Sequence, residues 1–120
     1  MIRAWVIQAQ RVQRWFHDSM MGVFRKTDLI IAPATPCSAP RIGQAMMGVR
    51  GEQVPIRPNL GLFTQPISCV GVPVVSVPIF SNTLPIGVQL IGPPWREDLC
   101  LRAAYALEAA GIAVSRPPVH

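Results

Sequence analysis

The feature that most constrains the fold is a run of apolar residues at helical spacing over the first 24 positions. At about 100° per residue they share one side of a helix: Ile2, Trp5, Val6, Ala9, Val12, Phe16, Met20, Val23 and Phe24. The charged residues lie on the opposite side: Arg3, Arg11, Arg14, Asp18 and Arg25. The pattern predicts one long amphipathic helix from Ile2 to about Phe24, whose apolar face has to be covered.

The composition indicates that the chain has more apolar surface than it is able to bury. Half of its 120 residues are apolar and only 14% are charged, against roughly 25% charged in an ordinary soluble domain. Small domains have a high surface-to-volume ratio. The few charges therefore point either to a membrane protein or to an apolar surface meant for a partner.

The apolar runs are too short for a membrane span. A spanning helix needs about 20 consecutive apolar residues, whereas the best runs, Leu29–Ala32 and Val74–Val77, each end at a proline. Polar residues near Met1, beginning with Arg3, interrupt any signal-peptide core. We therefore expect a cytoplasmic chain with no membrane span.

The middle of the chain predicts an α/β fold in a single domain. Leu29–Ala32 lacks alternation, which is typical of a strand covered on both faces in a parallel sheet. Residues 33–58 are rich in proline, glycine and serine and predict a long ordered loop, which is often functional. Residues 59–70 have mixed signals and room for a short helix.

The C-terminal third predicts a hairpin followed by a helix. Val74–Ile79 and Ile86–Ile91 are expected to pair antiparallel around a turn at Ser81–Thr83. Glu97 and Asp98 favour the first turn of a helix. Gly111 is expected to end this helix. About three short strands cannot cover a helix as large as the first one. This inventory of two helices and three strands is therefore incomplete.

The three cysteines, Cys37, Cys69 and Cys100, are far apart and form no C-x-x-C pair. Neither His17 nor His120 lies near a cysteine in sequence. A disulfide framework or a zinc site is not indicated, and reduced, mostly buried thiols are expected.

No classical catalytic constellation is visible in the sequence. No serine lies in a G-x-S-x-G elbow. His17 fits the flank of the first helix, and Lys26 fits the C-terminal end of the same helix, where a cation complements the dipole. The arginine side of that helix fits a solvated face, with binding to nucleic acid or a membrane surface as the alternative.

Five residues between apolar elements are candidates for a substrate pocket. Trp95 follows a double proline between a strand and a helix, where loops of α/β proteins commonly line sites. Its alternative role is a hydrophobic staple on the incoming helix. The polar candidates are Thr35, Asn59, Thr64 and Gln65.

The order of several motifs resembles the C-terminal part of amidase signature enzymes. These motifs are Asp28-Leu-Ile-Ile-Ala-Pro-Ala-Thr-Pro36, Phe63-Thr-Gln-Pro-Ile-Ser-Cys-Val-Gly-Val-Pro73, Val74-Val-Ser-Val-Pro78 and Leu84-Pro-Ile-Gly-Val-Gln-Leu-Ile-Gly92. Pro94–Arg102 is locally similar to fatty acid amide hydrolases, and Arg57–Pro66 to bacterial enzymes that act on biuret-like and carboxybiuret-like ureides. The resemblance covers nearly the whole chain.

The resemblance implies an α/β enzyme with a mixed sheet flanked by helices, which hydrolyses linear amides through a Ser-Ser-Lys set. One serine attacks the carbonyl, an acyl-enzyme forms, and water releases the acid. No metal or organic cofactor is implied. Nothing in this chain matches the serines or the lysine of that set, and Lys26 lies outside the motif.

We therefore expect residues 1–120 to be the C-terminal part of an amidase domain whose N-terminal catalytic part is absent. Met1 would correspond to an interior position of the full-length enzyme. The implied partners are the missing part and a small amide or ureide, without nucleic acid, and a homo-oligomer or an amidotransferase-like complex is compatible with the family. The amidase component of aminoacyl-tRNA amidotransferases often has an acidic residue just before the aromatic-Thr pair. This chain has Gly61-Leu62 at that place. The difference disfavours a site for an α-ammonium group.

Two functional hypotheses result. The first is a partial amidase that supplies sheet strands and a substrate-pocket wall and is inactive alone, with Trp95 also matching a tryptophan that lines the substrate route in fatty acid amide hydrolases. The alternative is a small basic protein that binds anionic lipid or RNA through residues 2–26.

Overall fold

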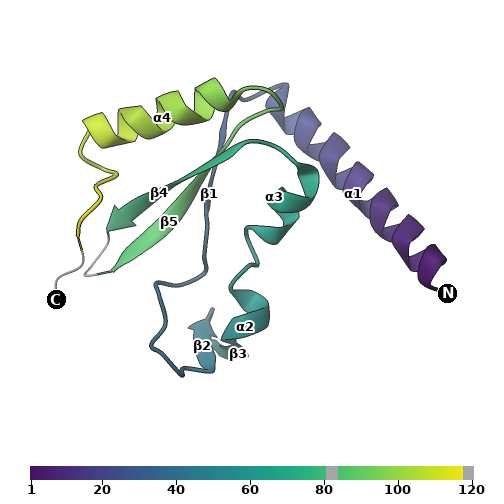
Figure 1. The fold of residues 1–120 in the computed structure, drawn as a ribbon, viewed down its shortest axis with the longest axis horizontal. Helices are drawn as coiled ribbons and strands as arrows, with labels where there is room; N and C mark the ends of the chain where they lie inside the picture. The colour runs from purple at the N-terminus through teal and green to yellow at the C-terminus, as the bar shows by residue number, and fades with distance from the viewer. Residues whose placement is uncertain (81–83, 118–120) are drawn as a thin grey trace.

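The chain is described here by a computed structural model that covers residues 1–80 and 84–117. Over these residues it forms four helices and five strands (Figure 1). Their bounds are α1 (Ile2–Phe24), β1 (Ile30–Pro33), β2 (Met46–Val49), β3 (Glu52–Pro55), α2 (Ile56–Asn59), α3 (Gln65–Val70), β4 (Val74–Phe80), β5 (Pro85–Ile91) and α4 (Glu97–Ala109).

The main sheet has the strand order β1-β5-β4, and both of its pairings are antiparallel. Ile91 at the end of β5 lies opposite Ile30 on one side and Val74 on the other. The predicted hairpin of β4 and β5 is confirmed, whereas the turn expected at Ser81–Thr83 lies outside the described residues. The short helix expected within 59–70 is α3.

The two faces of this sheet have different partners. Val77 and Leu90 are buried on the face toward α4, together with Ala113. Residues that pack around them are Leu29, Val75, Val88, Ala103, Ala104 and Leu107. Because side chains alternate along a strand, the neighbouring residues Ser76 and Gln89 point to the other face, where Ser68 of α3 lines the same cavity.

Helix α4 begins and ends as the sequence predicts. Glu97 and Asp98 lie in its first turn. Gly111 follows the helix with φ +70°, a left-handed conformation that glycine adopts without a Cβ clash. The backbone N–H groups of Gly111 and Ile112 then donate to the carbonyls of Glu108 and Leu107, which satisfies the last turn.

The prediction of a strand covered on both faces at Leu29–Ala32 is wrong in this structure. β1 is an edge strand that pairs antiparallel with β5, and the exposed fraction of Ile31 is 66%. A short apolar run does not carry strand direction, because direction depends on the distant partner strand.

The prediction of a long loop over residues 33–58 is also wrong. This segment contains the antiparallel hairpin β2–β3 and the beginning of α2. The hairpin turns at Arg50 and Gly51, whose φ angles of +52° and +85° match the twist of a tight two-residue turn. The proline and glycine content concealed two strands of only four residues each.

Helix α1 is confirmed, but its apolar face is uncovered. It projects from the sheet as a separate rod (Figure 1), and Met20 is its one buried residue. The exposed fractions of Trp5 and Trp15 are 73% and 68%. Its described contact is with α3, where the Gln13 side chain donates to the Cys69 carbonyl. None of the described helices is long and apolar enough to cross a membrane.

The whole chain is more open than its length requires. Its accessible surface is 9247 Å², whereas a folded monomer of 13.1 kDa exposes about 6,400 Å². Its radius of gyration is 16.8 Å, against roughly 14 Å for a compact domain of this length. The accessible surface beyond that of a compact monomer corresponds to the unburied apolar surface that the low charge content indicates.

Candidate functional site

The only buried polar side chain among the described residues is Gln89, in the middle of the central strand β5. Its exposed fraction is 3%. The amide Nε2 donates to the carbonyl oxygen of Pro33 at 2.9 Å and to that of Phe63 at 3.1 Å. One side chain therefore joins the end of β1 to the segment that precedes α3.

A cavity of about 430 Å³ lies beside Gln89, between the sheet and α3. Exposed residues such as Ser68, Val74 and Ser76 open it to solvent. Its lining is made of small and apolar side chains with four polar ones: Ala34, Thr64, Ile67, Ser68, Gly71, Val72, Val74, Ser76 and Gln89. A pocket of this size and polarity suits a small neutral ligand.

The cavity lacks the groups that amide hydrolysis needs. Its nine lining residues include neither a charged side chain nor a histidine. A serine or threonine hydroxyl is a weak nucleophile without an adjacent base, and the Thr64 hydroxyl already donates to the Gly61 carbonyl at 3.3 Å. The cavity lining that this chain supplies therefore pairs no hydroxyl with a charged or histidine base.

Of the five predicted pocket residues, one lines this cavity and a second is the sequence neighbour of a lining residue. Thr64 lines it, and Thr35 follows the lining residue Ala34, with its hydroxyl donating to the Cys37 carbonyl at 2.8 Å. A role for either in substrate binding stays a prediction. Gln89 was missed by the sequence reasoning, although one polar residue in the apolar strand Ile86–Ile91 is a usable signal.

The other three predicted pocket residues lie elsewhere. The Asn59 side chain donates to the Pro55 carbonyl at 2.8 Å, within the same helical turn, and Gln65 is exposed at the start of α3. Trp95 is 89% exposed, with φ +65°. This exposure contradicts the interpretation of Trp95 as a hydrophobic staple, because a staple packs against the following helix. A substrate role for these three also stays a prediction.

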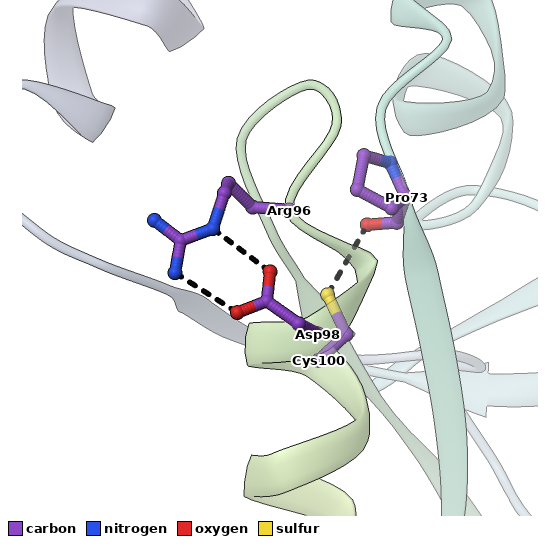
Figure 2. Close-up of polar contacts among 4 residues, drawn as sticks. All are labelled: Pro73, Arg96, Asp98 and Cys100. Atoms are coloured by element: carbon purple, nitrogen blue, oxygen red, sulfur yellow. Dashed lines mark hydrogen bonds and ion pairs between the residues drawn. The ribbon is translucent and has the colours of Figure 1, made fainter.

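The start of α4 is fixed by polar contacts (Figure 2). Asp98 accepts hydrogen bonds from Nε and Nη2 of Arg96 at 2.8 and 3.0 Å, and this pairing lowers the pKa of the Asp98 carboxyl. The Cys100 thiol donates to the Pro73 carbonyl at 3.6 Å. Burial raises the pKa of the Cys100 thiol and so favours its protonated form.

The prediction of mostly buried thiols is only partly correct. All three cysteines are free, but Cys100 alone is buried, while Cys37 is half-buried and Cys69 is exposed. Cys69 lies on α3, beside the uncovered apolar face of α1. Across residues 1–80 and 84–117 no cluster of three histidine, cysteine or acidic side chains is arranged to hold a metal ion.

Two of the cavities on helix α1 are also lined by residues of α3. The apolar one, of about 480 Å³, is lined by Trp5, Gln8, Ala9, Val12, Gln13, Trp15, Phe16, Pro66 and Cys69. The polar one, of about 720 Å³, is lined by Ile7, Gln10, Arg11, Gln13, Arg14, His17, Asp18 and Val70. The first is the uncovered helix face, and the second is the arginine side.

Comparison with known proteins identifies the family. The sequence profile of the family described as Amidase matches residues 1–101. The chain belongs to the amidase family. It is 50% identical over 113 residues to AtzE, the 1-carboxybiuret hydrolase subunit of Pseudomonas sp. (strain ADP), an alignment that covers 92% of this chain and 25% of that protein. It is 36% identical to a fatty acid amide hydrolase of Medicago truncatula, covering 94% of this chain and 19% of that one.

Solved structures show the same relationship. One belongs to a vestigial protein complex said to reveal the evolutionary origins of an s-triazine catabolic enzyme, and it superimposes with a TM-score of 0.89 at 48% identity, covering 95% of this chain and 26% of that one. A glutamyl-tRNA(Gln) amidotransferase component from Thermotoga maritima gives a TM-score of 0.74 at 33% identity, covering 88% and 22%. The chain thus spans about a quarter of the length of the amidases it matches.

Proposed function

We propose that this chain is the C-terminal part of an amidase that hydrolyses linear amides or ureides. In this proposal it supplies three sheet strands, the flanking helix α4 and one wall of the substrate pocket, and the catalytic serines and lysine come from the rest of the enzyme. The observation that carries the proposal is 50% identity over 92% of this chain to one quarter of a carboxybiuret hydrolase subunit. A cytoplasmic setting is part of this proposal.

The open surface supports a complement of this kind. The chain exposes 9247 Å², and the tryptophans of α1 lie on a face that a larger fold would bury. The occupant that we propose for this face is the remaining part of the amidase fold. Since relatives include subunits of amidotransferases, a further protein chain is also a candidate partner.

A chimera tests the proposal directly. This chain replaces the matching segment of AtzE, and hydrolysis of 1-carboxybiuret is compared with that of unaltered AtzE. We expect the chimera to turn over the ureide and the isolated 120-residue chain to give no hydrolysis. A folded chimera without activity, or an active isolated chain, contradicts the proposal.

The second candidate function is binding of anionic lipid or RNA by α1. It is favoured by one observation, the cavity lined by Arg11, Arg14 and His17. It requires binding that weakens with salt and is lost when Arg3, Arg11 and Arg14 are replaced by glutamine. Binding that is unchanged by these substitutions eliminates it.

A further inference from the structure

We propose that Gln89 determines specificity in the pocket wall, with its Oε1 accepting a hydrogen bond from an N–H group of a small amide or ureide. This inference rests on the proposed function, because it names the substrate group that the cavity beside α3 would hold. Three properties of the side chain carry it.

The orientation of the Gln89 amide is fixed by its neighbours. Nε2 has two hydrogens, and the structure gives both an acceptor, the carbonyl oxygens of Pro33 and Phe63. A flipped amide would place Oε1 against two carbonyl oxygens, which accept hydrogen bonds and do not donate them. The nitrogen must therefore face these two carbonyls, and the oxygen must point away from them.

The amide oxygen is available to a ligand. Within the described part of the chain no group donates a hydrogen bond to Oε1. In the same part of the chain, every fully buried side-chain nitrogen or oxygen has a hydrogen-bond partner. Oε1 is therefore not sealed in the protein interior, although Gln89 is almost wholly buried. Since Gln89 lines the cavity, this oxygen is presented to whatever occupies the cavity.

The remaining cavity chemistry favours a neutral group that carries both N–H and C=O. Oε1 is an acceptor and would repel a carboxylate placed against it. The hydroxyls of Ser68 and Ser76 are able to donate or accept. Since none of the lining side chains is charged, the ligand that matches this set is an amide or a ureide, with its N–H toward Gln89.

The anchoring of Gln89 also gives it a positioning role. Pro33 and Phe63 directly precede the lining residues Ala34 and Thr64 along the chain. Its two donated hydrogen bonds therefore fix both segments at the distance that leaves the cavity open. The Gln89 side chain thus sets the shape of the pocket and also accepts a hydrogen bond from the ligand.

The test measures binding to the isolated chain by NMR, with ¹⁵N-labelled glutamine side chains. The probes are biuret, which has N–H groups, and tetramethylurea, which keeps the carbonyl and has none. We expect biuret to shift the Gln89 side-chain resonances and to bind about tenfold more tightly than tetramethylurea, the scale of one buried hydrogen bond. Equal affinities, or Gln89 resonances that biuret leaves unmoved, overturn the inference.

A variant adds an independent measurement. Gln89→Met is expected to weaken biuret binding about tenfold and to weaken tetramethylurea binding by less, because only biuret loses a hydrogen bond in addition to the change in pocket shape. Gln53→Met on the exposed strand β3 serves as the matched control with no effect. If Gln89→Met does not fold, the two probes on the unaltered chain still decide. Biuret binding that Gln89→Met leaves intact overturns the inference.

The chimera separates this inference from the proposed function. In an active chimera, Gln89→Met should raise KM for the ureide about tenfold and leave kcat within a factor of about two, as expected for loss of uniform binding. An active chimera with an unchanged KM sinks the inference and leaves the proposed function standing. If the chimera is inactive but the isolated chain still binds biuret more tightly than tetramethylurea, the proposed function is contradicted and the inference about Gln89 stands.

Discussion

The thiol of Cys100 in α4 lies 3.6 Å from the carbonyl oxygen of Pro73, just before β4 (Figure 2). The same oxygen accepts the backbone N–H of Gly92 at 3.0 Å. The start of α4, the end of β5 and the start of β4 therefore meet at one carbonyl. This junction leaves little space, because a Cβ built on Gly92 would lie 2.7 Å from the Cys100 Sγ.

Gly92→Ala should destabilise the chain by about 1–3 kcal/mol, as expected for overpacking a buried site. Urea denaturation followed by far-UV circular dichroism measures the change. On a Cys100→Ala background the sulfur is gone, and the added methyl group should cost about 1 kcal/mol less. An equal cost in both backgrounds would show that the sulfur is not the obstacle.

Gly111→Ala should destabilise the chain by about 1–2 kcal/mol through its backbone alone. The φ angle at Gly111 is +70°, and a Cβ there would meet no atom within 4 Å. Gly22→Ala is the matched control, because Gly22 lies inside α1, and alanine should stabilise that helix by up to about 1 kcal/mol. The prediction fails if both substitutions change the denaturation midpoint in the same direction.

The Arg96–Asp98 pair should make stability depend on pH at the acid end. The pairing lowers the pKa of Asp98 from its ordinary value of 3.8, so the folded state binds the proton less readily than the unfolded state. The stabilisation is therefore present above pH 3.8 and is lost as the pH falls through the lowered value. Melting temperatures of the unaltered chain and of Asp98→Asn should differ at neutral pH and converge in acid.

The control for this pH dependence is Glu97→Gln. Glu97 shares the first turn of α4 with Asp98, but the hydrogen-bonded partner of Arg96 is Asp98. Asp98→Asn should therefore lower the melting temperature at neutral pH by more than Glu97→Gln does. Equal effects would assign the stabilisation to the helix dipole and not to the ion pair.

The uncovered face of α1 should become protected in the AtzE chimera. Trp5 and Trp15 are 73% and 68% exposed in the isolated chain. Hydroxyl-radical footprinting read by mass spectrometry should show both side chains oxidised in the isolated chain and several-fold less in the chimera. Equal oxidation in the two settings would argue that the amidase fold does not cover this face.

Much of the fold could be predicted from local patterns. The 3.6-residue period of α1, the acidic first turn of α4 and the glycine after it are properties of residues that are neighbours along the chain. The hairpin of β4 and β5 was accessible for the same reason, since its strands are close in sequence. Strands β2 and β3 were missed because four residues of mixed polarity carry little periodic signal.

The candidate site was predicted only in part, because its geometry is long-range. Thr64 and Thr35 were selected as polar residues in loops, and they lie at or beside the cavity. Gln89 joins backbone groups 56 and 26 residues away in sequence, and nothing local reveals those partners. For Trp95, the 89% exposure of its side chain excludes only the alternative role as a hydrophobic staple, and its predicted role in a substrate pocket stays a prediction.

The sequence by itself determined the helices, the central hairpin, the shortage of charge and the family resemblance. These follow from residue types and from their short-range order. The tertiary structure alone decided that β1 is an antiparallel edge strand, that Gln89 is buried between two carbonyls, and that the apolar face of α1 is exposed. Strand pairing, burial and cavity shape depend on which distant segments meet, and this is fixed by packing in three dimensions.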